Sequence, residues 1–264
     1  MAQCSPVYLV GAGPGDPELL TLKAMRLIQQ ADVVVYDRLV SQEIIAMIPP
    51  GATRIDVGKQ PRQHPVPQVE INAMLVRLAR KDRMVVRLKG GDPYTFGRGS
   101  EEALALVEQG VSCEVVPGIT SASGCAAAAG IPLTHRGVAT GVRYVTGHCR
   151  DNAALELDWD GLVDPKTTLV VYMAVANIRQ IAARMMARGA LPETPVAAIA
   201  SGTTPQQKVI LARLDGIADR LAEADLAGPV LFVIGQVVSL SMQIQGIDDG
   251  RQVERAALQH SLSG

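Results

Sequence analysis

The residues best suited to chemistry lie between Val86 and Glu102, in the stretch VRLKGGDPYTFGRGSEE. Gly90 and Gly91 expose backbone amides without a Cβ, and Asp92 adds a carboxylate that can accept hydrogen bonds from a ribose or an ammonium group. Arg98 stands between two glycines, and a long cation on an open backbone suits the recognition of a carboxylate. The alternative is a plain turn before a helix, with Asp92 as a local cap. Both interpretations place the stretch in a loop between a strand and a helix.

A second glycine-rich loop, GAGPGDP, spans residues 11–17 near the start of the chain. The dinucleotide-binding pattern G-x-G-x-x-G requires a third glycine at position 16, where this chain has Asp16. A carboxylate at a helix N-terminus would also repel a pyrophosphate. A dinucleotide site is therefore rejected here, and a turn without any ligand remains as probable as a ligand loop.

Composition excludes several classes of protein. The formal net charge of −1 argues against a partner that is a nucleic acid or a membrane surface, since such proteins carry a basic excess. The four cysteines are scattered without a C-x-x-C pair, so neither a disulfide framework nor a metal site is predicted. The chain has no signal-peptide layout and no apolar run of the roughly 18 residues that a membrane span needs. We therefore expect a cytoplasmic protein.

The elements that must position these loops alternate between strand and helix in the first half of the chain. Strands are expected at residues 7–10, 32–36, 54–57, 84–88 and 113–116, and helices at 21–30, 41–48, 68–81 and 101–109. The strands are apolar on both faces, which indicates a mostly parallel sheet covered by helices on both sides. In the first helix we expect Thr21 as the cap and an inward face made of Leu22, Met25, Leu27 and Ile28.

The second half has a different character. Strands are expected at residues 142–146, 168–172, 196–200, 207–211 and 230–234, with helices at 176–188 and 214–224. The two strands around the Gly-Thr-Thr-Pro turn predict a hairpin, and hence a mixed sheet. The chain is thus expected to be α/β, with domains at residues 1–138 and 142–247. The last residues, 248–264, have no core pattern and are expected to form a loose tail.

Several long motifs occur together in a fixed order, and their combination resembles the tetrapyrrole methylase family. They are Gly11–Pro17 with Leu20-Thr21, Leu88–Pro93 with Phe96–Gly99, Pro117–Ala122, Gly130–Arg136 and Val145–His148. The resemblance implies two α/β/α domains of the class III methyltransferase type, with the active site in the cleft between them. Departures from the family pattern occur at Tyr94-Thr95, Ser100 and Ala128, and they concern local packing and substrate fit.

The resemblance also implies an activity. It points to an enzyme that uses S-adenosyl-L-methionine to methylate uroporphyrinogen III at C-2 and C-7, giving precorrin-2 by way of precorrin-1. S-adenosyl-L-homocysteine is the cofactor product, and the pathway that uses precorrin-2 (siroheme, cobalamin or haem d1) stays open. A later precorrin or cobalt-precorrin methyltransferase is the nearest alternative, and His135-Arg136 favours the uroporphyrinogen reaction. An RNA- or protein-modifying methylase would need a basic face. A nucleotide-binding module without methyl transfer remains a third class.

By the same resemblance, individual residues receive roles. The cofactor-binding set comprises Pro14, Gly90, Gly91, Asp92, Thr95, Thr120, Ser121, Met173 and the loop Ser201-Gly202-Thr203. Asp37 corresponds to the proton acceptor of the family, and Lys59 to its proton donor. On sequence alone Met173 would be interpreted as a core residue, and Asp37 and Lys59 as charges on a solvated rim.

The substrate is a macrocycle with eight carboxylates, so a nearly neutral protein must bind it with a local cluster of arginines. Arg38, Arg62, Arg98, Arg136 and Arg150 are the candidates, and we favour Arg98 and Arg136 because both lie inside the family motifs. Arg98 and Glu101 complete the expected catalytic set with Asp37 and Lys59, and Glu101 is expected to orient Arg98. Alternatively, Glu101 could simply interact favourably with the helix dipole from the first turn of its helix. The resemblance further implies a homodimer.

Overall fold

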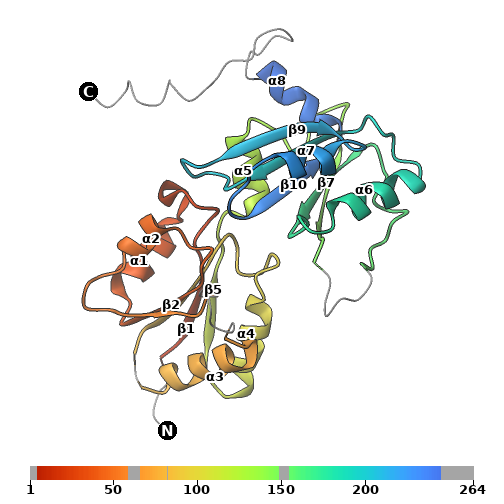
Figure 1. Cartoon of the computed structure of the whole chain (residues 1–264). Helices are drawn as coiled ribbons and strands as arrows, with labels where there is room; N and C mark the ends of the chain where they lie inside the picture. Colours follow the sequence, from red (N-terminus) through yellow and green to blue (C-terminus); the bar gives the residue numbers. More distant parts are fainter. Residues whose placement is uncertain (1–4, 59–65, 82, 149–154, 245–264) are drawn as a thin grey trace, which may run out of the picture.

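The computed structural model describes residues 5–58, 66–81, 83–148 and 155–244 of the chain. Within them the chain forms two α/β domains, each built around a five-stranded sheet (Figure 1). The expected tail at residues 248–264 lies outside the described residues. None of the helices in this described part is long and apolar enough to cross a membrane.

The first domain alternates strand and helix, as expected. Its strands are β1 (Val7–Gly11), β2 (Val33–Tyr36), β3 (Thr53–Asp56), β4 (Val85–Lys89) and β5 (Cys113–Val116). Its helices are η1 (Pro17–Leu19), α1 (Leu22–Gln30), α2 (Gln42–Ala46), α3 (Gln68–Ala79) and α4 (Gly99–Glu108). The strands are all parallel, in the order β3-β2-β4-β1-β5.

Helices cover both faces of this sheet, which explains why the central strands β1, β2 and β4 are mostly apolar, whereas the edge strand β3 is largely exposed. Helices α1 and α2 cover one face, where Leu27 and Ile44 pack against Val34 and Val86. Helices α3 and α4 cover the other face, where Leu75 packs among residues such as Val35 and Val85. The expected parallel, doubly covered sheet is confirmed.

The first turn of α1 contains one error of the sequence analysis. Thr21 caps the helix as expected, because its Oγ1 accepts a hydrogen bond from the Ala24 backbone N–H at 3.1 Å. Leu22, however, is 92% exposed. The buried stripe follows the helical period through Ala24, Leu27 and Ile28, and Leu22 lies about 200° around the helix from Ala24. The prediction that Leu22 faces the core was wrong.

The second domain holds a mixed sheet in the order β6-β7-β10-β8-β9. Its strands are β6 (Gly141–Thr146), β7 (Thr167–Tyr172), β8 (Pro195–Ala200), β9 (Lys208–Arg213) and β10 (Val230–Ile234). β6 and β7 are parallel, whereas β8 pairs antiparallel with both β9 and β10. The expected hairpin is therefore present as β8 and β9. The helices are α6 (Ile178–Ala187) and α7 (Ile217–Glu223), followed by η2 (Gln236–Ser239) and α8 (Leu240–Ile244), which the sequence does not predict.

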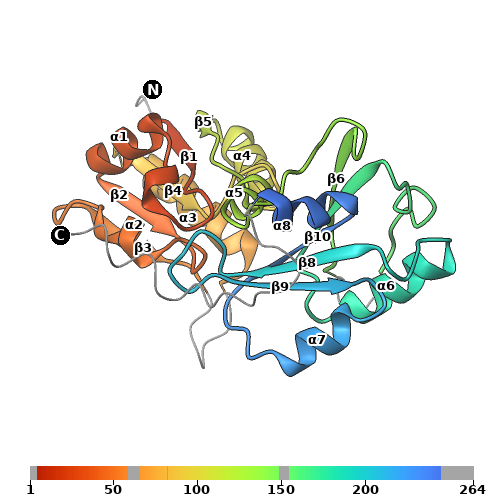
Figure 2. The same ribbon diagram turned by 90° about the horizontal axis from the view of Figure 1, so that it is seen from above.

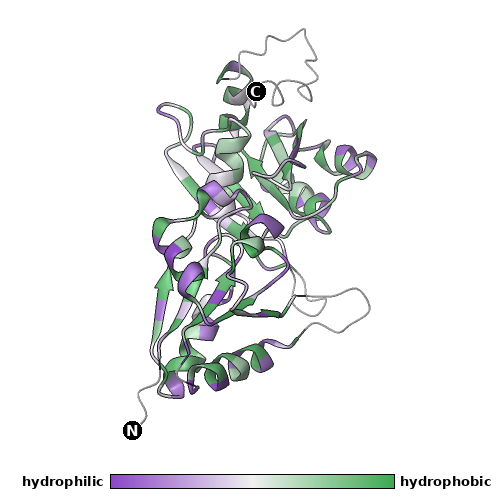
Figure 3. Cartoon of the chain, turned by 90° about the vertical axis from the view of Figure 1, so that its left-hand side faces the viewer, coloured by the Kyte–Doolittle hydropathy of each residue, from purple (hydrophilic) through white to green (hydrophobic). Residues whose placement is uncertain are grey.

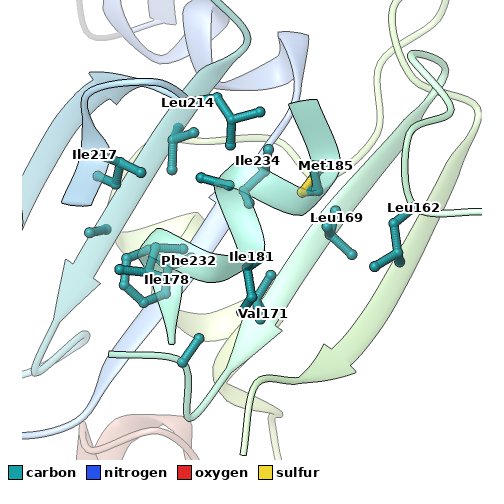
Figure 4. Packing of buried hydrophobic residues seen from close by; sticks show 14 of the residues in the cluster. Leu162, Leu169, Val171, Ile178, Ile181, Met185, Leu214, Ile217, Phe232 and Ile234 are labelled. Atoms are coloured by element: carbon teal, nitrogen blue, oxygen red, sulfur yellow. The ribbon is translucent and has the colours of Figure 1, made fainter. Parts of the chain in front are cut away.

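Helices α6 and α7 cover one face of the second sheet. The core beneath them is mainly aliphatic: Ile181 of α6 and Ile217 of α7 pack against Phe232 and Val171 of the strands (Figure 4). These side chains are completely buried, and each contributes about 1.5–3 kcal/mol by the hydrophobic effect. Hydrophilic and hydrophobic residues alternate along the helices of both domains (Figure 3).

Helix α5 (Ser121–Ala128) links the two domains through packing. Its buried small residues Ala122, Cys125 and Ala126 pack against Ile199 and other residues of the second sheet. In the sequence, however, α5 is the next element after β5, the last strand of the first sheet. Seen from above, α5 lies between the first domain and the strands of the second (Figure 2). The residue boundaries 1–138 and 142–247 stay a prediction, because α5 belongs to one unit by sequence and to the other by packing.

Candidate functional site

Four loops leave the first sheet at the same edge, since the strands before them are parallel. The strands β1 and β4 are neighbours in the sheet. The connection after β1 nevertheless leads to α1 on one face of the sheet, whereas the connection after β4 leads to α4 on the other face. In open α/β sheets such a reversal of strand order marks the place where ligands bind, beyond the carboxyl ends of the strands. The glycine-rich loops predicted from the sequence both lie at this point.

The loops after β1, β4 and β5 contact one another backbone to backbone. Gly91 donates its N–H to the Gly13 carbonyl at 2.6 Å, and Gly13 donates to the Gly91 carbonyl at 3.1 Å. A Cβ on Gly118 would lie only 2.3 Å from the Gly91 carbonyl oxygen. Glycine is therefore required here by the close approach of three backbones, and this explains the glycines of the first and third motifs.

Asp92 ties these loops together with both oxygens of its carboxylate. Oδ1 accepts from the Tyr94 N–H at 2.9 Å and from Thr95 Oγ1 at 3.2 Å, whereas Oδ2 accepts from the Gly118 N–H at 3.1 Å. The local cap considered in the sequence analysis is thus present in the fold. Since a carboxylate has room for about four hydrogen bonds, Asp92 retains capacity for one more donor.

Tyr172, at the end of β7, brings the second domain to this edge. Its hydroxyl lies 2.6 Å from Thr120 Oγ1 and accepts from the Ala122 N–H at 2.9 Å. Its ring lies against Phe96 of the β4 loop, with the centroids 4.8 Å apart. Burial raises the pKa of Tyr172, so the hydroxyl stays protonated. The sequence analysis missed Tyr172; its signal was a polar-tipped aromatic at the end of a buried strand.

The loop after β8 reaches the first domain at two further points. Thr203 Oγ1 accepts a hydrogen bond from the Asp16 N–H at 3.2 Å. Gly202 lies against α5 so closely that a Cβ there would be 2.4 Å from Cys125 Sγ. Burial raises the pKa of the Cys125 thiol to about 11, so this sulfur packs as a neutral apolar group.

Backbone strain concentrates in the same loops. Among the described residues, the non-glycine residues with positive φ all lie in the connections that follow β4, β7 or β8: Phe96, Arg98, Met173, Ser201 and Thr203. Each such conformation costs about 1–3 kcal/mol and persists only where the surrounding structure enforces it. Clusters of this kind are typical of ligand-binding sites.

Met173 combines a strained backbone conformation with an exposed side chain. It has φ of 53° and is 51% exposed, although it follows the buried strand β7 directly. The interpretation of Met173 as a core residue was wrong, because the left-handed turn directs the side chain away from the core of the second sheet. Leu39 and Phe96 are also partly exposed at this edge, at 53% and 39%. The loops therefore combine apolar surface with backbone polar groups.

The remaining cofactor-binding candidates lie in the same loops. Pro14 follows β1 and packs against α5, where a Cβ on Gly124 would be 2.4 Å from Pro14 Cγ. Ser121 opens α5 and lies beside Gly91, since a Cβ on that glycine would be 3.6 Å from Ser121 Oγ. Gly90 lies against Leu39 of the β2 loop. The whole predicted set is thus brought to the junction of the two domains.

Arg98 and Glu101 form an exposed pair at the start of α4. Arg98 is the N-cap residue and donates to both carboxylate oxygens of Glu101, at 2.9 Å from Nε and 2.7 Å from Nη2. This two-pronged contact raises the pKa of Arg98 and fixes the guanidinium plane. The other N–H groups of the guanidinium remain available for a carboxylate of a ligand.

Arg38 and Arg136, the other arginines predicted to bind the substrate, lie apart from Arg98. Arg38 is exposed in the β2 loop beside Asp37, and Arg136 is exposed on the turn between His135 and Ala139. No contact joins either arginine to Arg98 in the described part of the chain. Lys59, with Arg62 and Arg150, lies outside the described residues.

A buried group of charges adjoins Asp37 and was missed by the sequence analysis. Arg87 and Lys89 of β4 are each 3% exposed, and both contact Glu102 of α4, which is fully buried. Arg87 also donates to Asp37 Oδ2 at 3.2 Å. The available signal was two cations, two positions apart, in a strand that otherwise reads as buried.

Two other kinds of site were considered. Within the described residues, no three His, Cys, Asp or Glu side chains come together in a group that could hold a metal ion. A surface hollow in the second domain, lined by residues such as Leu162, Met185 and Leu191, contains none of the predicted site residues. The chemistry of the chain is therefore assigned to the junction of the loops.

Comparisons with known proteins identify the family of the chain. A model of the tetrapyrrole (corrin/porphyrin) methylases matches residues 6–218. The uroporphyrinogen-III C-methyltransferase of Paracoccus denitrificans is 54% identical over 235 residues, which cover 89% of this chain and 82% of that protein. The siroheme synthase of Acinetobacter baylyi is 53% identical over 239 residues, 90% of this chain and 52% of the relative, so the chain spans about half of that protein. The crystal structure of uroporphyrin-III C-methyl transferase from Thermus thermophilus complexed with S-adenyl homocysteine has 42% identity and a TM-score of 0.77, covering 89% of this chain and 94% of that one.

Proposed function

Because the chain belongs to the tetrapyrrole methylase family, we propose that it is an S-adenosyl-L-methionine-dependent C-methyltransferase that acts on uroporphyrinogen III. The observation that carries the proposal is the junction of strained and glycine-rich loops at the switch point of the first sheet, in a chain 54% identical to an enzyme named for that reaction. The similar fold from Thermus thermophilus holds S-adenyl homocysteine, which supports the choice of cofactor.

The residues at the junction fit such a cofactor. Exposed apolar side chains of Leu39, Phe96 and Met173 suit an adenine and a thioether, whereas Asp92 can accept one more hydrogen bond, for example from a ribose hydroxyl. The backbone at Gly90 and Gly91 offers further polar groups. The remaining contacts are proposed for residues from four segments, the loops after β1, β4 and β8 and the start of α5: Pro14, Thr95, Thr120, Ser121 and Gly202.

The bound cofactor supplies an electrophilic methyl group, so the protein has little covalent chemistry to perform. Its contribution is to hold the two reactants in line and to exclude water, which can account for several kcal/mol of the barrier. After methyl transfer a proton must leave the ring system. We assign its removal to Asp37, whose carboxylate is partly exposed at the carboxyl edge of the first sheet. Lys59 is proposed as the proton donor.

Substrate recognition is assigned to arginines. Arg98 presents a guanidinium whose plane is fixed by Glu101, and a fixed plane suits a bidentate contact with a propionate or acetate side chain. Arg38 and Arg136 are exposed and can meet other carboxylates of the macrocycle. The net charge of −1 makes such local cations the means of attracting a substrate with eight carboxylates.

The finer details of the reaction are proposed on the family resemblance. Methyl groups are added at C-2 and then C-7, by way of precorrin-1, and the precorrin-2 product serves siroheme, cobalamin or haem d1 synthesis. The same resemblance implies a cytoplasmic homodimer.

Turnover tests the proposal. The purified protein is incubated with uroporphyrinogen III and S-adenosyl-L-methionine under reducing conditions, and the product is analysed by mass spectrometry. We expect a doubly methylated product that requires both compounds. Absence of methylated product, in a protein that methylates a later precorrin instead, would assign the chain to another branch of the family.

A further inference from the structure

The buried charges beneath α4 have a geometry that converges on one site residue. Arg87 and Lys89 lie on the same face of β4 as Val85, the face that α3 and α4 cover. Most other residues on this face are apolar. Burying ions in such a layer is unfavourable, and well-packed hydrophobic residues are often at least as stabilising. Packing alone therefore does not explain the two cations.

Glu102 is the anchor of the group. Its Oε1 accepts hydrogen bonds from Lys89 Nζ at 2.9 Å, Gln68 Nε2 at 3.1 Å and Arg87 Nε at 3.2 Å. Its Oε2 has no hydrogen-bond partner in the described part of the chain. Three donors from β4 and α3 thus converge on one oxygen, and Glu102 is held rigidly under the sheet edge.

Arg87 connects the rigidly held Glu102 to the junction of the two domains. Every nitrogen of its guanidinium has a partner: Nε donates to Glu102, Nη1 donates to the Leu88 carbonyl at 2.8 Å, and Nη2 donates to Asp37 Oδ2 at 3.2 Å. A guanidinium is planar, so these contacts fix the direction of its Nη2 atom.

The register of the sheet explains why Asp37 receives this contact. Val35 of β2 pairs with Arg87 of β4, so Asp37, two residues further, lies on the same face just beyond the end of its strand. The second oxygen of Asp37 accepts from the Leu39 N–H at 3.1 Å. Asp37 is 24% exposed, whereas Arg87 is 4% exposed along its side chain. The buried network therefore reaches the site through this carboxylate.

We propose that Arg87, held by Glu102, is a positioning residue that fixes the Asp37 carboxylate at the junction in the orientation needed to take the proton from the methylated ring. This inference rests on the proposed function. Arg87 is 3% exposed, so it acts on the reaction through its contact with Asp37. Lys89 completes the group, since two cations and two carboxylates balance in charge.

A double-mutant cycle tests the proposal. Arg87→Met and Asp37→Asn are made singly and together, and kcat, KM and the Kd for S-adenosyl-L-homocysteine are measured for each. We expect Arg87→Met to lower kcat by about 10- to 100-fold with little change in that Kd, since general-base catalysis contributes about 10²- to 10⁴-fold. In the Asp37→Asn background, Arg87→Met should lower kcat no further. Equal losses in both backgrounds would overturn the proposal.

Two further variants separate positioning from stability. Leu106 lies one turn after Glu102 on α4 and is fully buried on the same face, so Leu106→Ala is a matched destabilising control. We expect it to lower the urea midpoint while kcat stays within about twofold of wild type at temperatures where it is folded. Should Arg87→Met not fold, Arg87→Lys replaces it in the cycle, because lysine keeps the charge and loses the rigid fork. A loss of kcat in Leu106→Ala equal to that in the Arg87 variant would contradict positioning.

The wild-type protein distinguishes the two proposals. A wild type that gives no methylated tetrapyrrole refutes the proposed function and this inference with it. An active wild type whose Arg87 and Asp37 effects are independent refutes the inference alone.

Discussion

The contact between Gly118 and its neighbours gives a sharp prediction about the site. A Cβ on Gly118 would lie 2.3 Å from the Gly91 carbonyl oxygen and 2.8 Å from the Gly11 Cα. Because ordinary van der Waals contact begins near 3.4 Å, Gly118→Ala must separate the loops after β1, β4 and β5 by about 1 Å. All the atoms involved are backbone, so no side chain can rotate away to relieve the clash.

The displacement has two measurable effects. Overpacking of this kind lowers the free energy of unfolding by about 1–3 kcal/mol. For a domain of this size, that corresponds to a fall in Tm of about 2–12 °C. A misplacement of about 1 Å in a positioned site can reduce its performance by about 10²-fold, so we expect the Kd for S-adenosyl-L-homocysteine to rise by about 10- to 100-fold. Isothermal titration calorimetry measures the Kd, and thermal unfolding measures the stability.

Gly51→Ala is the matched control, because a Cβ at Gly51 has no atom within 4 Å. Both its Tm and its Kd should equal those of the wild type. If Gly118→Ala bound S-adenosyl-L-homocysteine as tightly as the wild type, the assignment of these loops to the cofactor would be refuted.

Three further predictions concern single side chains. Tyr172→Phe leaves the buried Ala122 N–H without its acceptor, so the free energy of unfolding should fall by about 1–3 kcal/mol in urea titrations; an unchanged value would contradict the interdomain hydrogen bond. Burial lowers the pKa of Lys89 in the folded protein below its ordinary value of 10.5. Between these two pKa values the unfolded chain binds more protons than the folded protein, so Lys89 makes the free energy of unfolding increase with pH in this range. Lys89→Met should lack that contribution, and identical pH slopes for the two proteins would refute it. Arg98→Ala should lower kcat/KM for uroporphyrinogen III by about 10- to 100-fold and leave the cofactor Kd within about twofold; a collapse of cofactor affinity would reverse the assignment of Arg98.

The sequence predicts those features of the fold that depend on local patterns. The cap at Thr21, the strand Cys113–Val116 and the hairpin of β8 and β9 follow from residue type and periodicity, which act over a few neighbours. Leu22 was misplaced because it was assigned by its apolar side chain, although it lies about 200° around the helix from Ala24 and therefore outside the buried stripe. The packing of α5 on the second sheet depends on contacts between distant segments, which local patterns do not contain.

In the candidate site, too, local sequence patterns predict some features, whereas others depend on contacts between distant segments. Glycine content predicts Gly11–Pro17 and Gly90–Arg98 as loops, because close backbone approach leaves a signal in residue type, whereas their assignment to a cofactor came from the family resemblance. Residue type alone favours a core position for Met173, since its left-handed backbone leaves no such signal in a methionine, and only the family resemblance assigned it to the site. Arg87, Lys89 and Glu102 were missed because each reads as an ordinary surface charge until the sheet register and α4 bring them together.

The most direct test of the account is a crystal structure of the protein with S-adenosyl-L-homocysteine. We expect the ligand at the junction, in contact with the Gly90–Thr95 loop, the start of α5 at Thr120-Ser121 and Met173. A ligand bound elsewhere, for example in the hollow beside Met185, would contradict the central claim that the carboxyl edge of the first sheet and the loops of the second domain form the active site.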